Sequence, residues 1–479
     1  GFCKNIITVI NNAATALKLT LKDVKIDVSD TGKNTGYPWT SDEGKAALSV
    51  QGNGNVEIEL DGNNELKSGP HRAGLEKNTS TSTGTLTLKD DNNEAGSLTA
   101  TGGDWGAGIG NGGYYGNSDN RSGENITITG GTVNATGGWG GAGIGGGYYG
   151  SGKNITIKGG TVTATGGEEG AGIGGGYYYG GGYYGNGENI KITDGTVNAT
   201  GGWGGAGIGG GGGGGNGAGG NGKNITIIGG TVTAGGGYRG AGIGGGISGS
   251  GKNITITGGT VNADGGTNAA GIGGGATGSG SNVTVSGAAQ VTAIAGKSNG
   301  YYGAGATIGN GGDFTGSENV DGKEIQADIS RVTTGYIHHI IYDPALVSED
   351  NPLGIVREWW EPERPQPKPE NPQPNPEDPN APAEESNEVD LGTPLLHVET
   401  LEGDPLPFNA QQQGSTLRVT SDNLAARLHG TRQALEALQE QGVEQIQFVT
   451  TLKTTTLPVA ELLAEGGSWF ALEHDGLVS

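Results

Sequence analysis

The chain has 479 residues, which is long enough for more than one domain. It contains 105 glycines and 17 prolines, about a quarter of all residues, and this level is typical of low-complexity or disordered chains unless the glycines recur at a fixed period. The formal net charge of -23 argues against nucleic acid or an anionic membrane surface as a partner, because phosphate groups would be repelled.

The termini and the cysteine content limit the class of protein further. Cys3 is the single cysteine, so an intrachain disulfide is excluded. No apolar run approaches the roughly 20 residues that a membrane-spanning helix needs. The chain begins with GFCKN, without an initiator Met or a signal peptide, so we interpret it as a processed piece of a longer protein.

Residues 1–96 contain irregular runs in which apolar and polar residues alternate, such as ALKLTLKDVKIDVSD. Alternation with a period of two is typical of half-buried β-strands. We therefore expect residues 1–96 to form divergent N-terminal coils and a cap, followed by regular glycine-rich repeats over residues 97–330.

The regular part repeats a unit that opens with an Asn-Ile or Asn-Val run. The runs are separated by 29 or 35 residues, and the longer units carry six extra residues in the Gly/Tyr loop before the next run. They begin at Asn125, Asn154, Asn189, Asn224, Asn253 and Asn282. A fixed period of this size predicts a repeat architecture with its insertions in loops on one side.

Each unit holds three short runs of the types NITI, TVTA and GAGIG, and all three alternate apolar residues with polar residues or glycine. Three strands in each 29-residue coil predict an all-β fold, a parallel β-helix whose Ile, Val and Ala side chains point inward. Successive coils should stack at about 4.8 Å, the spacing of strands in a sheet. The rule for parallel crossovers predicts a right-handed winding.

Two rows of polar residues support this stacking. The Asn that opens each unit should form a ladder at a turn, since Asn tolerates the left-handed backbone region. The residues before it alternate in charge through Glu124, Lys153, Glu188 and Lys223, so opposite charges would face each other between neighbouring coils.

Beyond the repeats, residues 331–360 read as a terminal strand and cap, and residues 361–390 as an acidic, proline-rich linker. His338 and His339 are neighbours in the expected strand and would point to opposite faces, which favours a structural role over a shared metal ion. Residues 391–479 have an ordinary composition and predict a small α+β domain. Within it, DNLAARLHGTRQALEALQEQ is expected to form one helix and LPVAELLAEG a second.

The recurring NITI, GGTV, ATGG and GAGIGGG pieces resemble the glycine-rich β-helical repeats of secreted and cell-surface proteins of Gram-positive anaerobes, many of them from the gut. Such proteins are often described as carbohydrate-binding, and they are loosely related to a cellulose- and pectin-binding β-helix family with a lyase-like fold. The resemblance covers about residues 1–340 and implies an extracellular, secreted or surface-displayed protein. No sortase-type LPxTG signal is visible in the chain.

Catalytic and metal chemistry find little support in the sequence. A lyase or hydrolase needs clustered carboxylates, and Glu168 and Glu169 form the only dense pair in the repeats. We interpret this pair as solvated turn residues, so no catalytic residue is expected. The glycine- and aspartate-rich calcium repeat is absent, which leaves calcium without support, and we expect no cofactor or metal site.

Aromatic residues are the candidates for ligand binding, because they recur at two places beside the GAGIG-type runs. Three residues before the Ala of these runs, or one place later, stand Trp105, Trp139, Trp203, Tyr238 and Tyr301. Seven residues after the same Ala stand Tyr114, Tyr149 and Tyr178. Rows of aromatic rings on a solenoid are suited to stacking on sugars. The alternative is that the rings pack over the glycine-rich loops, and the sequence leaves both open.

Three functions are consistent with these observations. The first is a non-catalytic, adhesin-like protein that binds a polysaccharide or host glycan through the aromatic rows. The second is a structural stalk or a subunit that self-associates into filaments, and the third is a β-helix polysaccharide lyase. An ice-binding face formed by outward Thr residues is disfavoured, because Lys191 interrupts the row that Thr127 and Thr156 begin.

Overall fold

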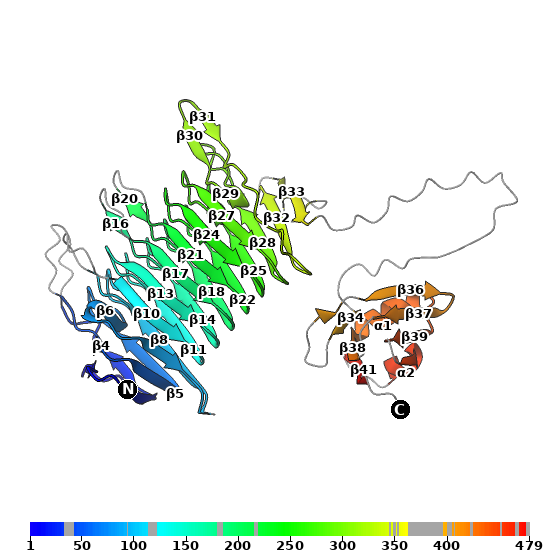
Figure 1. The fold of residues 1–479 in the computed structure, drawn as a ribbon, viewed down its shortest axis with the longest axis horizontal. Helices are drawn as coiled ribbons and strands as arrows, with labels where there is room; N and C mark the ends of the chain where they lie inside the picture. Colours follow the sequence, from blue (N-terminus) through cyan, green and yellow to red (C-terminus); the bar gives the residue numbers. More distant parts are fainter. Residues whose placement is uncertain are drawn as a thin grey trace, which may run out of the picture. The chain divides into compact units, whose positions relative to one another are not determined.

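A computed structural model gives the fold of the chain (Figure 1). It describes all residues except 33–42, 93, 114–121, 180–184, 215–218, 344–345, 348–350, 352–353, 363–395, 400–404, 407, 422–424, 451–452, 465–468 and 476–479. The chain divides into two units, residues 1–368 and 369–479. Nearly all of the predicted proline-rich linker falls within 363–395 and so lies outside the described residues.

The first unit is a parallel β-helix in which the regular coils each add one strand to each of three sheets (Figure 1). The first sheet holds the NITI-type strands β2 (Leu17–Lys22), β5 (Val56–Lys67), β7 (Leu86–Lys89), β10 (Ser122–Ile128), β13 (Ser151–Ile157), β17 (Gly187–Ile192), β21 (Gly222–Ile227), β24 (Gly251–Ile256) and β27 (Gly280–Val285). The second sheet holds the TVTA-type strands β3 (Lys25–Asp27), β8 (Gly96–Thr101), β11 (Thr132–Thr136), β14 (Thr161–Thr165), β18 (Thr196–Thr200), β22 (Thr231–Gly235), β25 (Thr260–Asp264) and β28 (Gln290–Ala295), together with the second half of β5. The third sheet holds β1 (Ile7–Ile10), β4 (Leu48–Gly52), β6 (Leu75–Ser82) and the short Ile-Gly strands β9 (Ile109–Gly110), β12 (Ile144–Gly145), β15 (Ile173–Gly174), β19 (Ile208–Gly209), β23 (Ile243–Gly244), β26 (Ile272–Gly273) and β29 (Ile308–Gly309). The predicted parallel β-helix with three strands per coil is confirmed.

The core consists of ladders of identical apolar residues, because equivalent positions pair in register between coils. Ile126 pairs with Ile155 in the first sheet, and Val133 pairs with Val162 in the second. These side chains are fully buried. Complete burial of a side chain of this size contributes about 1.5–3 kcal/mol, so the repeated ladder is the main source of stability.

The predicted Asn ladder is confirmed at the turn within the first sheet. All six Asn residues have positive φ angles between 53° and 58°. Asn125 donates to the backbone carbonyl oxygen of Thr83, and each later side-chain amide donates to the side-chain oxygen of the Asn one coil earlier, as in Asn189 to Asn154 at 3.1 Å. The left-handed backbone therefore aims a continuous line of amides along the stack.

Glycine ends each of the short Ile-Gly strands of the third sheet for a steric reason. Gly145 has a φ of 130°, and a Cβ atom there would lie 2.1 Å from the carbonyl oxygen of Gly174 in the next coil. A side chain at this position would therefore separate the coils.

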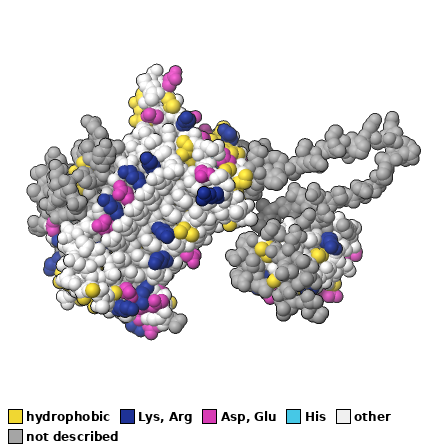
Figure 2. Space-filling view, in the orientation of Figure 1, with side chains coloured by type: hydrophobic (Ala, Val, Ile, Leu, Met, Phe, Trp, Pro, Cys, Tyr) yellow, Lys and Arg dark blue, Asp and Glu magenta, His cyan; other side chains and the backbone are white. Residues whose placement is uncertain are grey.

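The predicted alternation of charge is also confirmed, since Glu124, Lys153, Glu188 and Lys223 pair in register across four coils. Lys223 Nζ lies 3.9 Å from Glu188 Oε1. Figure 2 shows charged side chains in lines along the stack, with broad uncharged areas between them. An exposed pair of this kind contributes at most about 1 kcal/mol, so the line sets register more than stability.

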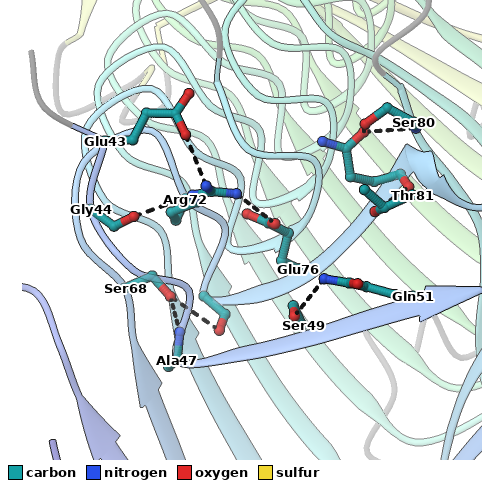
Figure 3. Close-up of polar contacts among 12 residues, drawn as sticks. Glu43, Gly44, Ala47, Ser49, Gln51, Ser68, Arg72, Glu76, Ser80 and Thr81 are labelled. Carbon is teal, nitrogen blue, oxygen red and sulfur yellow. Dashed lines mark hydrogen bonds and ion pairs between the residues drawn. The ribbon is translucent and has the colours of Figure 1, made fainter. Parts of the chain in front are cut away.

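The N-terminal coils replace glycine ladders with a polar cluster (Figure 3). Arg72 donates to Glu43 at 2.8 Å and to Glu76 at 3.1 Å, and its Nε lies 3.3 Å from the carbonyl oxygen of Gly44. Glu76 aligns with Gly110 of the next coil and is almost fully buried. Burial raises the pKa of Glu76, and the charge of Arg72 opposes that shift.

The C-terminal end of the solenoid is covered by β32 (Tyr336–Tyr342), which pairs with β28, and by the antiparallel strand β33 (Ile355–Glu361). His338 and His339 point to opposite faces, as predicted: the ring of His338 stacks on Trp360 and that of His339 stacks on Trp359. His339 is buried beside Thr307.

Among its described residues, the second unit contains two four-stranded sheets and two short helices. One sheet is formed by β34 (Leu396–Glu399), β35 (Pro405–Leu406), β38 (Ala425–Thr431) and β41 (Trp469–Asp475), and the other by β36 (Asn409–Gln413), β37 (Thr416–Thr420), β39 (Gln445–Val449) and β40 (Thr454–Pro458). The helices are α1 (Arg432–Glu440) and α2 (Val459–Ala464).

The prediction of one helix over DNLAARLHGTRQALEALQEQ is wrong in its first half, because residues 425–431 form β38. Ala426 and Leu428 are both fully buried with exposed or half-buried neighbours, which is the period of a strand. Leu435 and Leu438 are spaced for a helix and lie in α1. Leu428 and Leu435 are seven residues apart, a spacing that also fits a helix, so the sequence predicts a longer helix than the burial pattern supports.

Candidate functional site: an exposed aromatic patch

Two rows of loop residues face each other beside the third sheet, and they form a small second core. We define the inner loop row as the residues two places before the Ala of each GAGIG-type run, and the facing loop row as those six places after it. The inner loop row contains Trp105, Gly140, Glu169, Gly204, Arg239 and Asn268. The facing loop row of the next coil contains Tyr148, Tyr177, Gly212, Ile247, Ala276 and Gly312. The N–H of each facing residue donates to the carbonyl oxygen of its inner partner at 2.7–3.0 Å.

In five of the six pairs at least one side chain is small, whereas Trp105 and Tyr148 are both large. Gly140 faces Tyr177, and Glu169 faces Gly212. Arg239 faces Ala276. In each of these pairs one partner is small, so the other can lie over it and fill the space between loops.

The first loops contain a buried aromatic cluster, which we define as Trp105, Trp139, Tyr148, Tyr149 and Tyr177. Trp105 and Tyr148 stack with ring centroids 4.9 Å apart, and Trp139 meets Tyr177 edge-on at 5.2 Å. Trp105 is 6% exposed and Tyr148 is 3% exposed. In this part of the solenoid the rings pack over the glycine-rich loops.

Glu169 follows Gly140 in the inner loop row. It was predicted to be a solvated turn residue, and the structure shows that it is not. Glu168 is exposed, as expected of a solvated turn residue, but the Oε2 atom of Glu169 is buried and has no hydrogen-bond partner. Burial raises the pKa of Glu169 to about 7, and the charge of Glu168 adds to the shift. The nearby backbone N–H of Gly204 partly offsets the rise of this pKa.

The later loops present aromatic rings to solvent. Trp203 and Tyr238 are 44% and 43% exposed, and their rings stack at 5.6 Å with an interplanar angle of 24°. Tyr301 is 56% exposed and stacks on Phe314 at 4.4 Å and 17°. Phe314 belongs to the hairpin of β30 (Asp313–Thr315) and β31 (Glu318–Val320). The coil that contains Ile272 separates the coil of Tyr238 from that of Tyr301.

Arg239 joins the two pairs. Its guanidinium carbon lies 4.7 Å from the ring centroid of Tyr302, 5.7 Å from that of Trp203 and 6.0 Å from that of Tyr238. Tyr302 in turn meets both Tyr301 and Phe314 edge-on. We call these residues the aromatic patch: Trp203, Tyr238, Arg239, Tyr301, Tyr302 and Phe314.

Five of the eight predicted site residues fall into two groups. Trp203, Tyr238 and Tyr301 lie in the exposed aromatic patch. Trp105 and Tyr178 are buried, so little of their ring surface is available to a ligand. These two side chains therefore agree with the alternative that the rings pack over the glycine-rich loops.

The other three predicted residues belong to neither group. Trp139 and Tyr149 are half-buried against the buried aromatic cluster. Tyr114 lies outside the described residues. Tyr301 was assigned to the row of Trp203, but Ile308 pairs with Ile272, so this row position falls two residues later and Tyr301 belongs to a longer loop.

Five residues were not among the predicted site residues: Arg239, Tyr302 and Phe314 in the aromatic patch, and Tyr148 and Tyr177 in the buried aromatic cluster. Counting six places after the repeat Ala would have found both tyrosines. Arg239 directly follows Tyr238, which was among the predicted site residues. Phe314 reaches the patch only through the hairpin, and no periodicity in the sequence signals that.

The described part of the chain shows neither a metal site nor a membrane-spanning helix. No group of three or more His, Cys, Asp or Glu residues there could hold a metal ion. No helix among the described residues is long and apolar enough to cross a membrane.

Comparison with known proteins agrees with the fold. Five segments match the family described as Beta helix repeat, at residues 126–148, 155–177, 190–212, 225–247 and 254–276. Each segment runs from the first sheet to the facing loop row, so the match covers one coil at a time. No curated protein and no solved structure matches the chain.

Proposed function

We propose that the chain is a non-catalytic saccharide-binding protein and that the aromatic patch is its binding surface. The observation that carries the proposal is the exposure of two stacked ring pairs joined by Arg239. Stacked rings on a rigid scaffold offer flat apolar surface at little entropic expense, and tyrosine hydroxyl groups can bond to sugar hydroxyls. Three coil spacings separate Trp203 from Phe314, so the patch extends over about 14 Å.

The position of the patch also supports binding rather than packing. Rings of the buried aromatic cluster fill the space between glycine loops, whereas Trp203, Tyr238 and Tyr301 leave about half of their surface in water. Exposed aromatic groups of this size are uncommon without a partner. The resemblance of the repeats to carbohydrate-binding surface proteins supports the same function and an extracellular location.

The test compares a double variant with a matched control. Trp203→Ala with Tyr238→Ala removes one stacked pair from the surface. Ile228→Ala is the control, because Ile228 is 42% exposed in a turn between the first and second sheets. Binding of the full chain to a panel of neutral and charged oligosaccharides is measured by calorimetry, and thermal unfolding checks the fold.

We expect the double variant to lose at least about tenfold in affinity, since each exposed aromatic contact is worth on the order of 1 kcal/mol, while the control keeps its affinity. Absence of binding by the unchanged chain across the whole panel would refute the proposal.

A structural role is the second candidate, and the unbroken Asn ladder favours it, because continuous ladders make a rigid rod. Under this alternative the aromatic patch contacts a second copy of the chain. Light scattering over a range of protein concentration distinguishes the two: association that the double variant abolishes favours the stalk or filament, and a monomer that binds sugar favours the first proposal.

A further inference from the structure

Arg239 is the feature of the aromatic patch that a neutral sugar does not require. The side chain is half-buried, and its Nε atom is buried without a hydrogen-bond partner. Among the described residues, no hydrogen bond or ion pair of the Arg239 guanidinium group is found, although the chain has 50 acidic and 27 basic side chains. A cation without a counter-charge in an otherwise acidic protein is available to bind an anionic group of a ligand.

The surroundings of Arg239 fix the position of its charge. Contacts with the rings of Trp203, Tyr238 and Tyr302 hold the guanidinium group at the junction of the two stacked pairs. Guanidinium presents five N–H donors in a planar fork that matches a carboxylate or a sulfate group. Apolar rings around it exclude water and strengthen a charge-assisted hydrogen bond.

We infer that the aromatic patch selects a short saccharide that carries a single carboxylate or sulfate group, with Arg239 as the residue that recognises the anion. This inference rests on the proposed function and names its ligand class. A sugar ring would stack on Trp203 and Tyr238, and its acidic group would reach the guanidinium fork of Arg239.

A single charge on the ligand follows from the electrostatics of the whole chain. The net charge of -23 repels a polymer with a negative group on every sugar. One guanidinium group can neutralise one anion. A saccharide with one acidic group among neutral rings gains the local contact and largely avoids the long-range repulsion, which is screened beyond about 8–10 Å at physiological salt.

The experiment uses the full chain and three matched probes: an oligosaccharide with one carboxylate, its methyl ester and its counterpart with one sulfate group. A fully charged uronic acid polymer is the fourth probe. We expect the carboxylate or the sulfate form to bind about tenfold more tightly than the methyl ester, as one charge-assisted pair predicts. We expect the polymer to bind more weakly per sugar than the single-charge probe.

Variants separate recognition from packing. Arg239→Gln should bring the ratio of the acid and methyl ester dissociation constants close to one, and Arg239→Lys should restore part of it. Lys297→Gln is the control for loss of one positive charge in the same region, and it should leave the ratio within about twofold. A purely structural Arg239 would change thermal stability and affinity for all probes alike.

The outcomes distinguish this inference from the proposed function. Equal affinity for the acid and the methyl ester, both lost in the Trp203/Tyr238 double variant, overturns the inference and keeps the proposed function. A ratio that survives in Arg239→Gln also overturns the inference. If neither form nor any member of the neutral panel binds, both proposals fail.

Discussion

Oε2 of Glu169 lies so close to Gly212 that a Cβ atom on Gly212 would come within 2.5 Å of it. The same Cβ atom would lie 2.9 Å from the carbonyl oxygen of Glu169, so a movement of the carboxylate alone would not make room. Gly212→Ala should therefore destabilise the solenoid by about 1–3 kcal/mol, as overpacking does. Thermal unfolding measures the effect.

Gly235→Ala is the control for this substitution, because no atom lies within 4 Å of a Cβ atom built on Gly235. It should change the unfolding temperature little. In a Glu169→Ala background, Gly212→Ala should be less harmful than in the unchanged chain, since the two residues fill one space. Additive effects of the two substitutions would show that they do not share it.

Glu169 also predicts how stability depends on pH. Its pKa is raised to about 7 in the folded chain, above the ordinary carboxyl value, so the native state binds the proton more tightly than the unfolded state does. The stability contributed by Glu169 is then greatest at acidic pH and is lost as pH rises from about 4.5 through 7. Glu169→Gln should remove this loss and raise stability at pH 8 by about 2 kcal/mol, with little change at pH 4.

The measurement is the unfolding temperature of both proteins across that pH range. A matched substitution, Glu168→Gln, removes the adjacent exposed carboxylate and should leave most of the decline in place. If the unchanged chain and Glu169→Gln lose stability in parallel as pH rises, the buried carboxyl is not the cause.

Periodicity predicted the ladders of the solenoid because each ladder position obeys the same rule in every coil. Ile126 and Ile155 occupy one core position, and an alternating apolar pattern is enough to identify it. The left-handed turn at Asn154 follows from residue type. At these positions the local backbone conformation and the stacking of the coils favour the same type of residue.

The candidate site was only partly predictable, because it depends on where the repeat is broken. Trp105 lies two places before the repeat Ala and is buried against Tyr148, whereas Trp203 lies three places before it and is 44% exposed. Tyr301 and Phe314 meet through an inserted loop and a hairpin that follow no period. Packing determines which side chains are exposed in such loops, and the spacing of aromatic residues along the sequence does not reveal that packing.

The Asn ladder allows backbone strain to be separated from hydrogen bonding. Asn189 has a φ of 56°, and its amide links Asn154 to Asn224. Asn189→Gly loses the two side-chain bonds but suits the left-handed backbone, whereas Asn189→Ala loses the bonds and adds about 1 kcal/mol of strain. We expect both variants to lower the unfolding temperature and Ala to lower it more. Equal effects of Gly and Ala would mean that the turn relaxes.

His339 predicts that the C-terminal end of the solenoid is sensitive to acid. Its ring is 3% exposed, stacks on Trp359 at 4.4 Å, and shares a hydrogen bond with the Thr307 hydroxyl through Nδ1. Burial lowers the pKa of His339 to about 4, and the charges of His338 and Arg357 add to the shift. The unfolded state therefore takes up a proton at a higher pH than the folded state does.

Stability from His339 is present in full above about pH 6.5, and it is lost as pH falls from there towards 4, by up to about 3 kcal/mol. Hydrogen exchange of the β32 amides should accordingly speed up between pH 6.5 and 4, after correction for the intrinsic pH dependence of exchange. His339→Gln should flatten that change. His338→Gln alters the ring on the opposite face and leaves the contact with Thr307 intact, so it should keep the acid sensitivity. Loss of the sensitivity in His338→Gln, with its persistence in His339→Gln, would assign the effect to the His338 imidazole.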